Sequence, residues 1–280
     1  MTVGRLAPTP SGRLHLGNAL AFGAAWLSAR AAGGRVLLRI EDVDRARART
    51  EIERSIRDDL RWLGLEWDEE TPPQRVRPYE PWLGALGHQL YRCRCTRAEL
   101  AAFDAYPGTC RDRGHPDGAV RLRLPPGEVE FVDRRWGLVR VDPTTTFGDP
   151  VLRRRDGSFA YPLAVVVDDL CDGVTEVVRG ADLLEYTAVQ IHLWRAFGAT
   201  PPTWMHAPLL LGPDGKKLSK SHGSTEIAAL ARAGWTPDDV WRQLLPFLGL
   251  DGFDHVRDAV GAFDPRGGGR GPFTVDATSR

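Results

Sequence analysis

A loop rich in Pro, Ser and Gly, residues 8–13, lies between a predicted strand (3–7) and a predicted helix (15–32) and could bind a phosphate group. The first turn of a helix gathers unpaired N–H groups and a partial positive charge, which suits a nucleotide phosphate. Gly17 would let a ligand approach the backbone closely. His15 could donate a hydrogen bond to a phosphate oxygen as negative charge builds there. The alternative is a turn with a capping histidine and no ligand.

A second loop, residues 212–223, carries lysines that could act on the same kind of ligand. Lys217 and Lys220 are separated only by Leu-Ser, and glycines bound the loop. Lysine is a compact and mobile point charge, so this loop could close over a triphosphate and stabilise a leaving pyrophosphate. The alternative is a solvated basic loop.

Three cysteines lie close together in the sequence, at Cys93, Cys95 and Cys110. They supply three thiolates, one ligand short of the usual tetrahedral zinc site. From ligand chemistry alone, His115 is the fourth candidate. The alternative is a group of reduced core cysteines without a metal.

The elements around these loops predict an α/β fold. A buried strand is expected over 35–40, and an amphipathic helix over 50–63, where Thr50 and Glu53 form a capping-box signature. Strands that alternate with helices imply parallel βαβ units with helices covering the sheet.

Short strands then follow, over 119–124, 129–132 and 137–141, and they indicate an inserted module. The α/β pattern resumes with strands over 161–167 and 175–178, a helix over 183–197 and a strand over 204–211. Two helical segments come after the lysine loop. The predicted organisation is an α/β domain over 1–92 and 151–223, an insertion over 93–150, a helical segment over 224–263 and a disordered tail over 264–280.

Composition excludes some partners and locations. Lys+Arg 37 offsets Asp+Glu 37, so a net charge of +0 gives no general attraction to nucleic acid. No stretch approaches the roughly 20 apolar residues that span a bilayer, so no membrane is expected. The N-terminus lacks the regions of a signal peptide, which predicts a cytoplasmic protein.

Two of these motifs carry a family resemblance. His15-Leu-Gly-Asn18 resembles the HIGH signature of class I aminoacyl-tRNA synthetases, and Lys217-Leu-Ser-Lys-Ser221 resembles their KMSKS signature. Asn18 replaces the second histidine of HIGH, which the glutamyl and glutaminyl branch often lacks. The resemblance implies a Rossmann-like parallel-sheet catalytic domain, ATP as a substrate with Mg²⁺, ATP contacts from His15, Gly17, Asn18 and Lys220, and catalysis by His15, Lys217 and Lys220.

The runs 5–15, 39–44, 159–169 and 176–183 resemble glutamyl-tRNA synthetases. A guanidinium fork is the best partner for a side-chain carboxylate, and the predicted strands place two of the arginines at the same face. An anion at a strand end suits the α-ammonium group, and a tyrosine can orient the ligand. The glutamate site implied in this way consists of Arg5, Leu6, Ala7, Pro8, Thr9, Glu41, Tyr161 and Arg179. Asp42 and Asp44 are expected to be structural.

The chain is most similar in organisation to the glutamyl-Q tRNA(Asp) synthetases, which are truncated paralogues of glutamyl-tRNA synthetase. About sixty residues follow Ser221, too few for a large helical anticodon-binding region. That family carries a Cys-x-Cys…Tyr-x-x-x-Cys zinc site. The resemblance therefore implies one Zn²⁺ held by Cys93, Cys95, Tyr106 and Cys110, with Tyr106 in place of His115.

The activity implied by this resemblance is ATP-dependent activation of L-glutamate without tRNA, followed by esterification to queuosine in tRNA(Asp), by a monomer. Three alternatives remain open. One is a truncated glutamyl-tRNA synthetase that charges a tRNA 3′ end. Another is a HIGH-type nucleotidyltransferase or amino-acid ligase with a small-molecule acceptor. The third is a non-catalytic RNA-binding paralogue.

Overall fold

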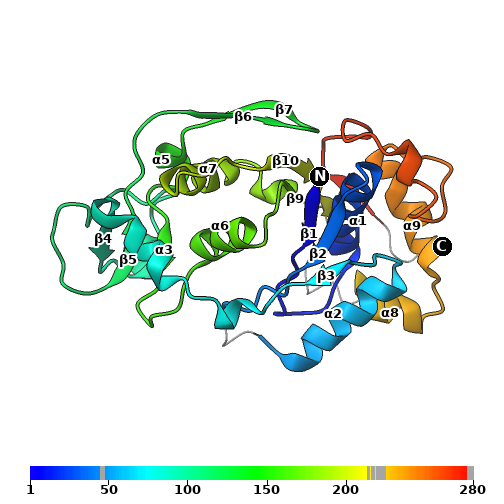
Figure 1. Cartoon of the computed structure of the whole chain (residues 1–280), viewed down its shortest axis with the longest axis horizontal. Coiled ribbons are helices and arrows are strands. Elements are labelled where there is room, and N and C mark those ends of the chain that lie inside the picture. Colours follow the sequence, from blue (N-terminus) through cyan, green and yellow to red (C-terminus); the bar gives the residue numbers. More distant parts are fainter. Residues whose placement is uncertain (45–47, 213–214, 216–217, 219–224, 276–280) are drawn as a thin grey trace.

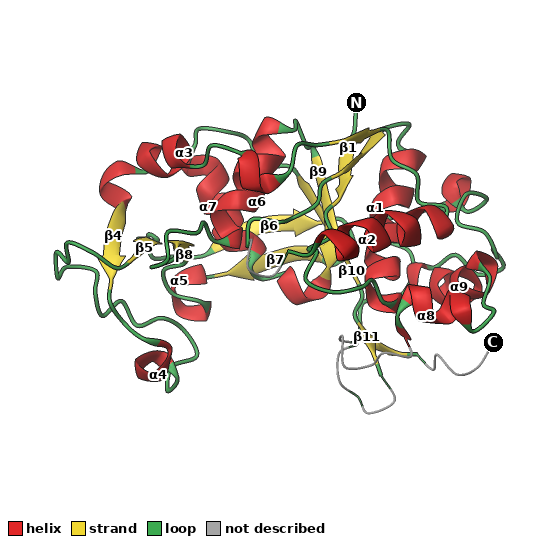
Figure 2. Ribbon diagram, turned by 90° about the horizontal axis from the view of Figure 1, so that it is seen from below, coloured by secondary structure: helices red, strands yellow, loops and turns green. Residues whose placement is uncertain are grey.

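Parallel strands form the centre of the molecule (Figures 1 and 2). The computed structural model describes residues 1–44, 48–212, 215, 218 and 225–275. One group of strands has the order β1-β2-β3, and a second group has the order β7-β6-β10-β9, in which only the β6–β7 pair is antiparallel. The two groups meet where β1 and β9 lie side by side, since the amide of Thr175 donates to the carbonyl of Val3 over 3.0 Å. The strands are β1 (Val3–Leu6), β2 (Arg35–Leu38), β3 (Glu69–Glu70), β6 (Val129–Asp133), β7 (Gly137–Val141), β9 (Glu176–Gly180) and β10 (Thr203–Ala207).

Helices cover both faces of these strands. In β2, Val36 and Leu38 pack with one group of helices, while Leu37 packs with the other. Because successive side chains of a strand point to opposite faces, the sheet is buried on both sides. The predicted α/β fold with a parallel sheet is confirmed. The first group of helices is α1 (Leu16–Ala31), α2 (Thr50–Trp62), α8 (Ile227–Arg232) and α9 (Pro237–Leu244), and the second is α6 (Tyr161–Cys171) and α7 (Thr187–Ala196).

The C-terminal helices pack against the parallel-sheet domain through α1. A Cβ on Gly23 of α1 would lie 2.6 Å from the indole ring of Trp241, so only glycine permits this approach. The fully buried indole of Trp241 also donates to the carbonyl of Leu63 over 2.8 Å. The segment after the lysine loop therefore packs on the helix that follows His15.

Two predictions about helices are wrong. Residues 161–167 form the start of helix α6 and not a strand. This helix is buried on nearly all sides, so its apolar run has no helical periodicity to read, and Pro162 lies in the first turn, where its missing N–H costs nothing. The capping box at Thr50 is also absent: Arg49 is the N-cap of α2, and no side chain caps it.

A separate antiparallel sheet lies at the end of the molecule opposite α8 and α9 (Figure 1). It has the order β4-β5-β8 and thus uses strands on both sides of the expected 93–150 boundaries, whereas β6 of the same interval pairs with β10. The elements here are α3 (Glu80–Ala85), β4 (Leu90–Cys93), α4 (Arg97–Leu100), β5 (Ala119–Leu122), α5 (Pro143–Thr146) and β8 (Val151–Arg153).

The predicted strand over 204–211 is divided into β10 and β11 (Leu210–Leu211), and β11 pairs with β12 (Phe273–Thr274). The prediction of a disordered tail over 264–280 is therefore wrong for residues 264–275. Among the helices that the structure describes, none has the length and apolar character needed to cross a membrane.

Candidate active site

A cavity of about 330 Å³ opens at the carboxyl ends of β1 and β9. It collects residues from the phosphate loop, the start of α1, the segment after β2, the start of α6 and the end of β9. Leu6, which belongs to the predicted glutamate site, does not line this cavity, because its side chain is fully buried in the core on the α1 face of β1. The sequence-predicted residues that line the cavity are Arg5, Ala7, Pro8, Thr9, His15, Asn18, Glu41, Tyr161 and Arg179.

Arg5 is only partly engaged by the protein. Its Nε lies 3.3 Å from Oδ1 of Asp169, and its Nη1 donates to the carbonyl of Val178 over 3.0 Å. Within the part of the chain that the structure describes, its Nη2 makes no hydrogen bond. The side chain is nearly buried, so this donor edge faces the cavity and suits an incoming carboxylate.

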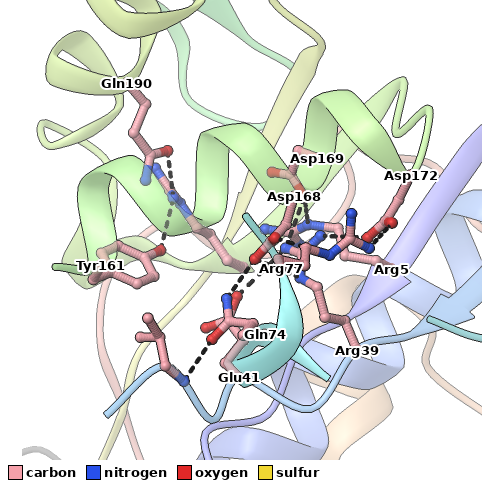
Figure 3. A network of polar contacts seen from close by, with 12 residues as sticks. Arg5, Arg39, Glu41, Gln74, Arg77, Tyr161, Asp168, Asp169, Asp172 and Gln190 are labelled. Carbon is pink, nitrogen blue, oxygen red and sulfur yellow. Dashed lines mark hydrogen bonds and ion pairs between the residues drawn. The ribbon is translucent and has the colours of Figure 1, made fainter. Parts of the chain in front are cut away.

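Behind Arg5 lies Arg39, the centre of a buried ionic network (Figure 3). Arg39 is fully buried, and its guanidinium lies 2.7 Å from Asp169, 3.3 Å from Asp172, 3.4 Å from Glu41 and 4.0 Å from Asp168. Burial opposes the charged guanidinium, but these four carboxylates raise the pKa of Arg39 well above its usual value. The network fixes Asp169, which holds Arg5 in turn.

Glu41 borders the cavity, and the charges of Arg39 and Arg5 both act on its carboxylate. Burial raises the pKa of Glu41, while Arg39 and then Arg5 act in the opposite direction. A ligand ammonium at this position would favour the carboxylate form in the same way. By contrast, Asp42 turns away from the cavity and is ion-paired with Arg75.

Arg179 is fully engaged by the protein. Its Nε donates to Nε2 of His206 over 3.1 Å. Its Nη1 donates to Tyr161 Oη over 3.2 Å and to Gln190 Oε1 over 2.7 Å; Figure 3 labels these two partners. Its Nη2 donates to Thr187 Oγ1 over 2.8 Å and to a backbone carbonyl over 3.3 Å. Five acceptors thus match the five N–H groups, which fixes the plane of the guanidinium.

His206, which accepts a hydrogen bond from Arg179, is itself bonded to a buried carboxylate. Nδ1 of His206 lies 2.7 Å from Oδ2 of Asp133, and both side chains are fully buried. Burial lowers the pKa of His206 to about 4, against the effect of Asp133. The neutral ring therefore donates from Nδ1 to Asp133 and accepts at Nε2 from Arg179.

His15 is the N-cap of α1, and Asn18 completes a capping box. Nδ1 of His15 accepts from the amide of Gly17 over 3.1 Å, and Oδ1 of Asn18 accepts from the amide of His15 over 3.1 Å. In the neutral ring the proton then sits on Nε2. A Cβ on Gly17 would lie 3.0 Å from this imidazole, so glycine at this position allows the ring to lie where it does. Asn18 thus has a structural role where the HIGH signature has histidine.

The chain is similar to proteins of known family. Residues 1–258 match the family model described as "tRNA synthetases class I (E and Q), catalytic domain". A glutamyl-Q tRNA(Asp) synthetase of Nitratidesulfovibrio vulgaris is 47% identical over 282 residues, covering 89% of this chain and 87% of that protein. The protein of the same name from Pseudomonas aeruginosa is 46% identical over 236 residues, covering 81% and 80%. The chain belongs to the glutamyl-Q tRNA(Asp) synthetase family of class I.

A solved structure agrees with this assignment. The glutamate tRNA ligase of Elizabethkingia meningosepticum, crystallised in complex with its amino acid, matches with a TM-score of 0.84 and 25% identity, over 99% of this chain and 67% of that one. The class I synthetase catalytic fold therefore includes the parallel strands and the loops that line the cavity.

The predicted lysines of this synthetase, Lys217 and Lys220, lie outside the described residues. Gly17 does not line the main cavity but borders a smaller one next to it, together with His15 and Asn18. The structure thus brings together the phosphate loop and the predicted glutamate residues, and leaves the lysine loop as a prediction.

The three cysteines come together in the antiparallel end of the synthetase. Their Sγ atoms lie within 4.8 Å of one another, and those of Cys95 and Cys110 are 3.5 Å apart. A tetrahedral zinc ion with bonds of about 2.3 Å places its sulfur ligands about 3.8 Å apart, so the spacing suits zinc. The Oη of Tyr106 lies 3.5 Å from Cys93 Sγ. In the part of the chain that the structure describes, the group consists of these cysteines and does not include His115.

The surroundings of the cluster fit a metal-bound form. Burial opposes the thiolate of Cys93, but hydrogen bonds from Tyr106 and Arg121 lower its pKa to about 7. The guanidinium of Arg121 stacks 3.7 Å above the ring of Tyr106. Gly148 permits the close approach of Tyr106, because a Cβ at this left-handed position (φ +69) would lie 2.2 Å from the Tyr106 carbonyl oxygen.

Sequence reasoning missed four functional neighbours of the glutamate residues, namely Asp169, Thr187, Gln190 and His206. The residue Asp169 stands inside a run that already resembles the family, so its acidic pair was a readable signal. No comparable signal marks His206, because sheet pairing of β10 with β9 brings it to Arg179.

Proposed function

We propose that this synthetase activates L-glutamate with ATP to glutamyl-adenylate in the absence of tRNA, and then transfers the glutamyl group to queuosine in tRNA(Asp). The observation that carries the proposal is the cavity in which Arg5 offers an unused donor edge close to the buried carboxylate of Glu41. The names of the relatives support the acceptor. Monomeric action is part of the proposal, and light scattering tests it.

The side chains divide the recognition of glutamate. Arg5 pairs with the side-chain carboxylate of the substrate, and Glu41 pairs with its α-ammonium group. Arg179 has all its donors matched inside the protein, so it acts by orienting the hydroxyl of Tyr161 and by its positive charge. Backbone from Ala7 to Thr9 lines the side of the cavity toward the phosphate loop.

Activation needs orientation and charge stabilisation and no covalent enzyme intermediate. An α-carboxylate oxygen of glutamate forms a bond to the α-phosphorus of ATP, and the bond to pyrophosphate breaks. His15 donates from Nε2 to a phosphate oxygen as charge grows, and the start of α1 adds its positive end. Lys217 and Lys220 stabilise the leaving pyrophosphate. Bound Mg²⁺ supplies charge neutralisation at the triphosphate.

In the second step a hydroxyl oxygen of the queuosine ring attacks the activated carbonyl carbon. An ester forms, the bond to AMP breaks, AMP leaves with the electron pair, and the hydroxyl proton is released. A truncated glutamyl-tRNA synthetase that esterifies a tRNA 3′ end would share the first step, so only the acceptor distinguishes the two.

Glutamate-dependent ATP–pyrophosphate exchange without tRNA tests activation. We expect exchange with L-glutamate, and a much lower rate with glutamine, which cannot form the ion pair with Arg5. Absence of exchange with the purified, zinc-supplemented protein would overturn the activation step. Transfer of labelled glutamate to tRNA(Asp) with and without queuosine tests the acceptor, and equal transfer to both would favour the 3′ end.

We infer that Cys93, Cys95, Tyr106 and Cys110 hold one zinc ion in the module around 93–150. The ion would supply a rigid crosslink between β4 and the loop before β5. Metal analysis of the purified protein should find one zinc per chain, and Cys95→Ser should lose it. Tyr106→Phe should weaken zinc binding while His115→Ala leaves it unchanged; the reverse pattern would make His115 the fourth ligand.

A further inference from the structure

A second cavity lies away from the glutamate site, between the β6–β7 turn and the C-terminal segment. Its volume is about 570 Å³. Figure 1 shows the β6–β7 pair running toward the red C-terminal segment, whose residues 264–270 supply the other wall. Four arginines and two aspartates are among the residues that line it: Arg134, Arg135, Arg266, Arg270, Asp133 and Asp264.

Arg135 is the unusual member of this set. Its side chain is fully buried, and its Nη1 donates to the carbonyl of Gly269 over 3.3 Å. Its Nε and Nη2 are buried and have no hydrogen-bond partner among the residues that the structure describes. A guanidinium cannot give up its charge in a protein, so these two donors and the charge need a partner from elsewhere.

The two aspartates do not meet this need. Asp133 is nearest in sequence, but its Oδ2 is bonded to His206, and its Oδ1 accepts from the backbone amides of Arg135 and Trp136. Asp264 accepts from the amide of Arg266 over 2.9 Å, and no ion pair joins it to Arg135 in the described part of the chain. The cavity thus keeps an excess of positive charge.

We propose that this cavity binds a phosphate group, with Arg135 as its inner donor and the exposed Arg266 and Arg270 as its rim. A tetrahedral oxyanion has enough oxygens to accept from several guanidinium groups at once, and arginine matches its geometry well. The group could belong to free phosphate or to the backbone of an RNA. Both present the same oxygens, so the experiment separates them.

Free phosphate is tested first, with thermal unfolding of the full-length protein in phosphate-free buffer and during titration with inorganic phosphate. We expect the wild type to gain about 5 °C once phosphate exceeds its Kd about a hundredfold. Arg270→Glu and Arg135→Met should lose this gain. Arg140→Ala, on β7 and outside the cavity, is the matched control and should keep it.

Two controls keep the result specific. His15→Ala weakens phosphate binding at the proposed ATP site, so a gain that survives His15→Ala but not Arg270→Glu belongs to the new cavity. Arg135→Met should be no less stable than the wild type without phosphate, because it removes an uncompensated charge. If this variant unfolds much earlier in phosphate-free buffer, the protein itself satisfies Arg135, and the proposal is wrong.

The RNA source is tested by the salt dependence of tRNA binding. If the cavity holds a backbone phosphate, Arg270→Ala should reduce the slope of log Kd against log salt by about 1. An unchanged slope together with phosphate protection would assign the cavity to free phosphate. No protection and no change of slope would overturn the site. The thermal and the salt measurements both test phosphate binding alone, so their results do not depend on whether the protein activates glutamate.

Discussion

Arg39 and Arg135 are both fully buried, yet the protein treats their charges in opposite ways. Four carboxylates lie within 4.0 Å of Arg39, and they raise the pKa of its guanidinium. Burial lowers the pKa of Arg135, which has one hydrogen bond from Nη1 to a backbone carbonyl. Removing a charge from water is costly unless partners surround it, so the first arginine can serve as scaffold while the second requires a ligand.

Arg5 lies between these extremes. Asp169 and a carbonyl engage part of its guanidinium, and the rest faces the cavity. The degree to which the protein compensates a buried charge therefore separates three roles: scaffold for Arg39, substrate contact for Arg5 and anion site for Arg135. Each role can be broken by substitution, and the expected effects decrease in the order given below.

The largest effect is expected for Arg39→Met. Its loss would leave Glu41, Asp168, Asp169 and Asp172 facing one another without their central cation. We expect the free energy of unfolding to fall by about 4 kcal/mol, as for other broken buried ion pairs. Urea unfolding of both proteins measures this fall in the free energy of unfolding. Arg140→Met removes an exposed pair with Glu130, and this control should leave the free energy of unfolding almost unchanged. Similar losses for both variants would mean that Arg39 is not a scaffold residue.

The next effect concerns catalysis. Arg5→Met should reduce glutamate-dependent ATP–pyrophosphate exchange about 100-fold or more, mainly through a higher KM for glutamate, because the carboxylate of the substrate loses its charged partner. The KM for ATP should change little. Arg5→Lys keeps the charge but not the fork and should recover only part of the activity. A raised KM for ATP with an unchanged KM for glutamate would contradict the assignment.

Asp59 of α2 tests the same principle with the opposite charge. Its Oδ2 is buried and has no hydrogen-bond partner in the part of the chain that is described, and burial raises its pKa to about 7 from 3.8. Between these values the folded state holds a proton that the unfolded chain has released, so stability falls as the pH rises toward 7. Asp59→Asn removes this dependence.

We expect the gain in unfolding free energy from Asp59→Asn to be about 2 kcal/mol greater at pH 8 than at pH 5. Urea unfolding at both pH values measures the difference. Asp58→Asn is the control, since Asp58 is exposed and pairs with Arg61 across one helical turn. An equal gain at both pH values would mean that Asp59 ionises like a free aspartate.

Local sequence could predict only part of this arrangement. The start of α1 at His15 follows from a strand–loop–helix pattern, and family resemblance placed Arg5, Glu41, Tyr161 and Arg179 in one site, where the structure brings them together around the cavity. The apolar run 161–167 predicts a strand although it forms a helix, because a helix buried on nearly all sides has no amphipathic period.

The residues that pair with each buried charge could not be predicted from the sequence, for a different reason. Arg5 and Asp169 are 164 residues apart, and Asp133 and His206 are 73 residues apart. No spacing along the chain encodes such pairs, since strand order and register determine them. The cavity around Arg135 also depends on the C-terminal segment, which composition alone had marked as disordered.

His206 gives the smallest expected effect and the most specific test of how Arg179 is held. It is a positioning residue, because it acts through Arg179 and does not line the glutamate cavity. His206→Phe removes the acceptor for Arg179 Nε, so the guanidinium and Tyr161 lose their fixed orientation. We expect the KM for glutamate to rise about tenfold with a smaller change in kcat.

His206→Gln should restore part of the affinity for glutamate, because its side-chain oxygen can still accept a hydrogen bond from Arg179. If His206 had only a structural role, the rise in KM would follow the loss of stability in both variants. The exposed His88→Ala is the control. Since burial lowers the pKa of His206 to about 4, the ring stays neutral from pH 6 to 8, and the wild-type KM should show no titration from it there. As the pH falls from 6.5 toward 4, the unfolded chain takes up a proton on this histidine that the folded protein does not bind, so the free energy of unfolding decreases. A glutamate KM that titrates near pH 6.5 in the wild type but not in His206→Gln would show that His206 carries a charge, and the neutral link to Arg179 would be wrong.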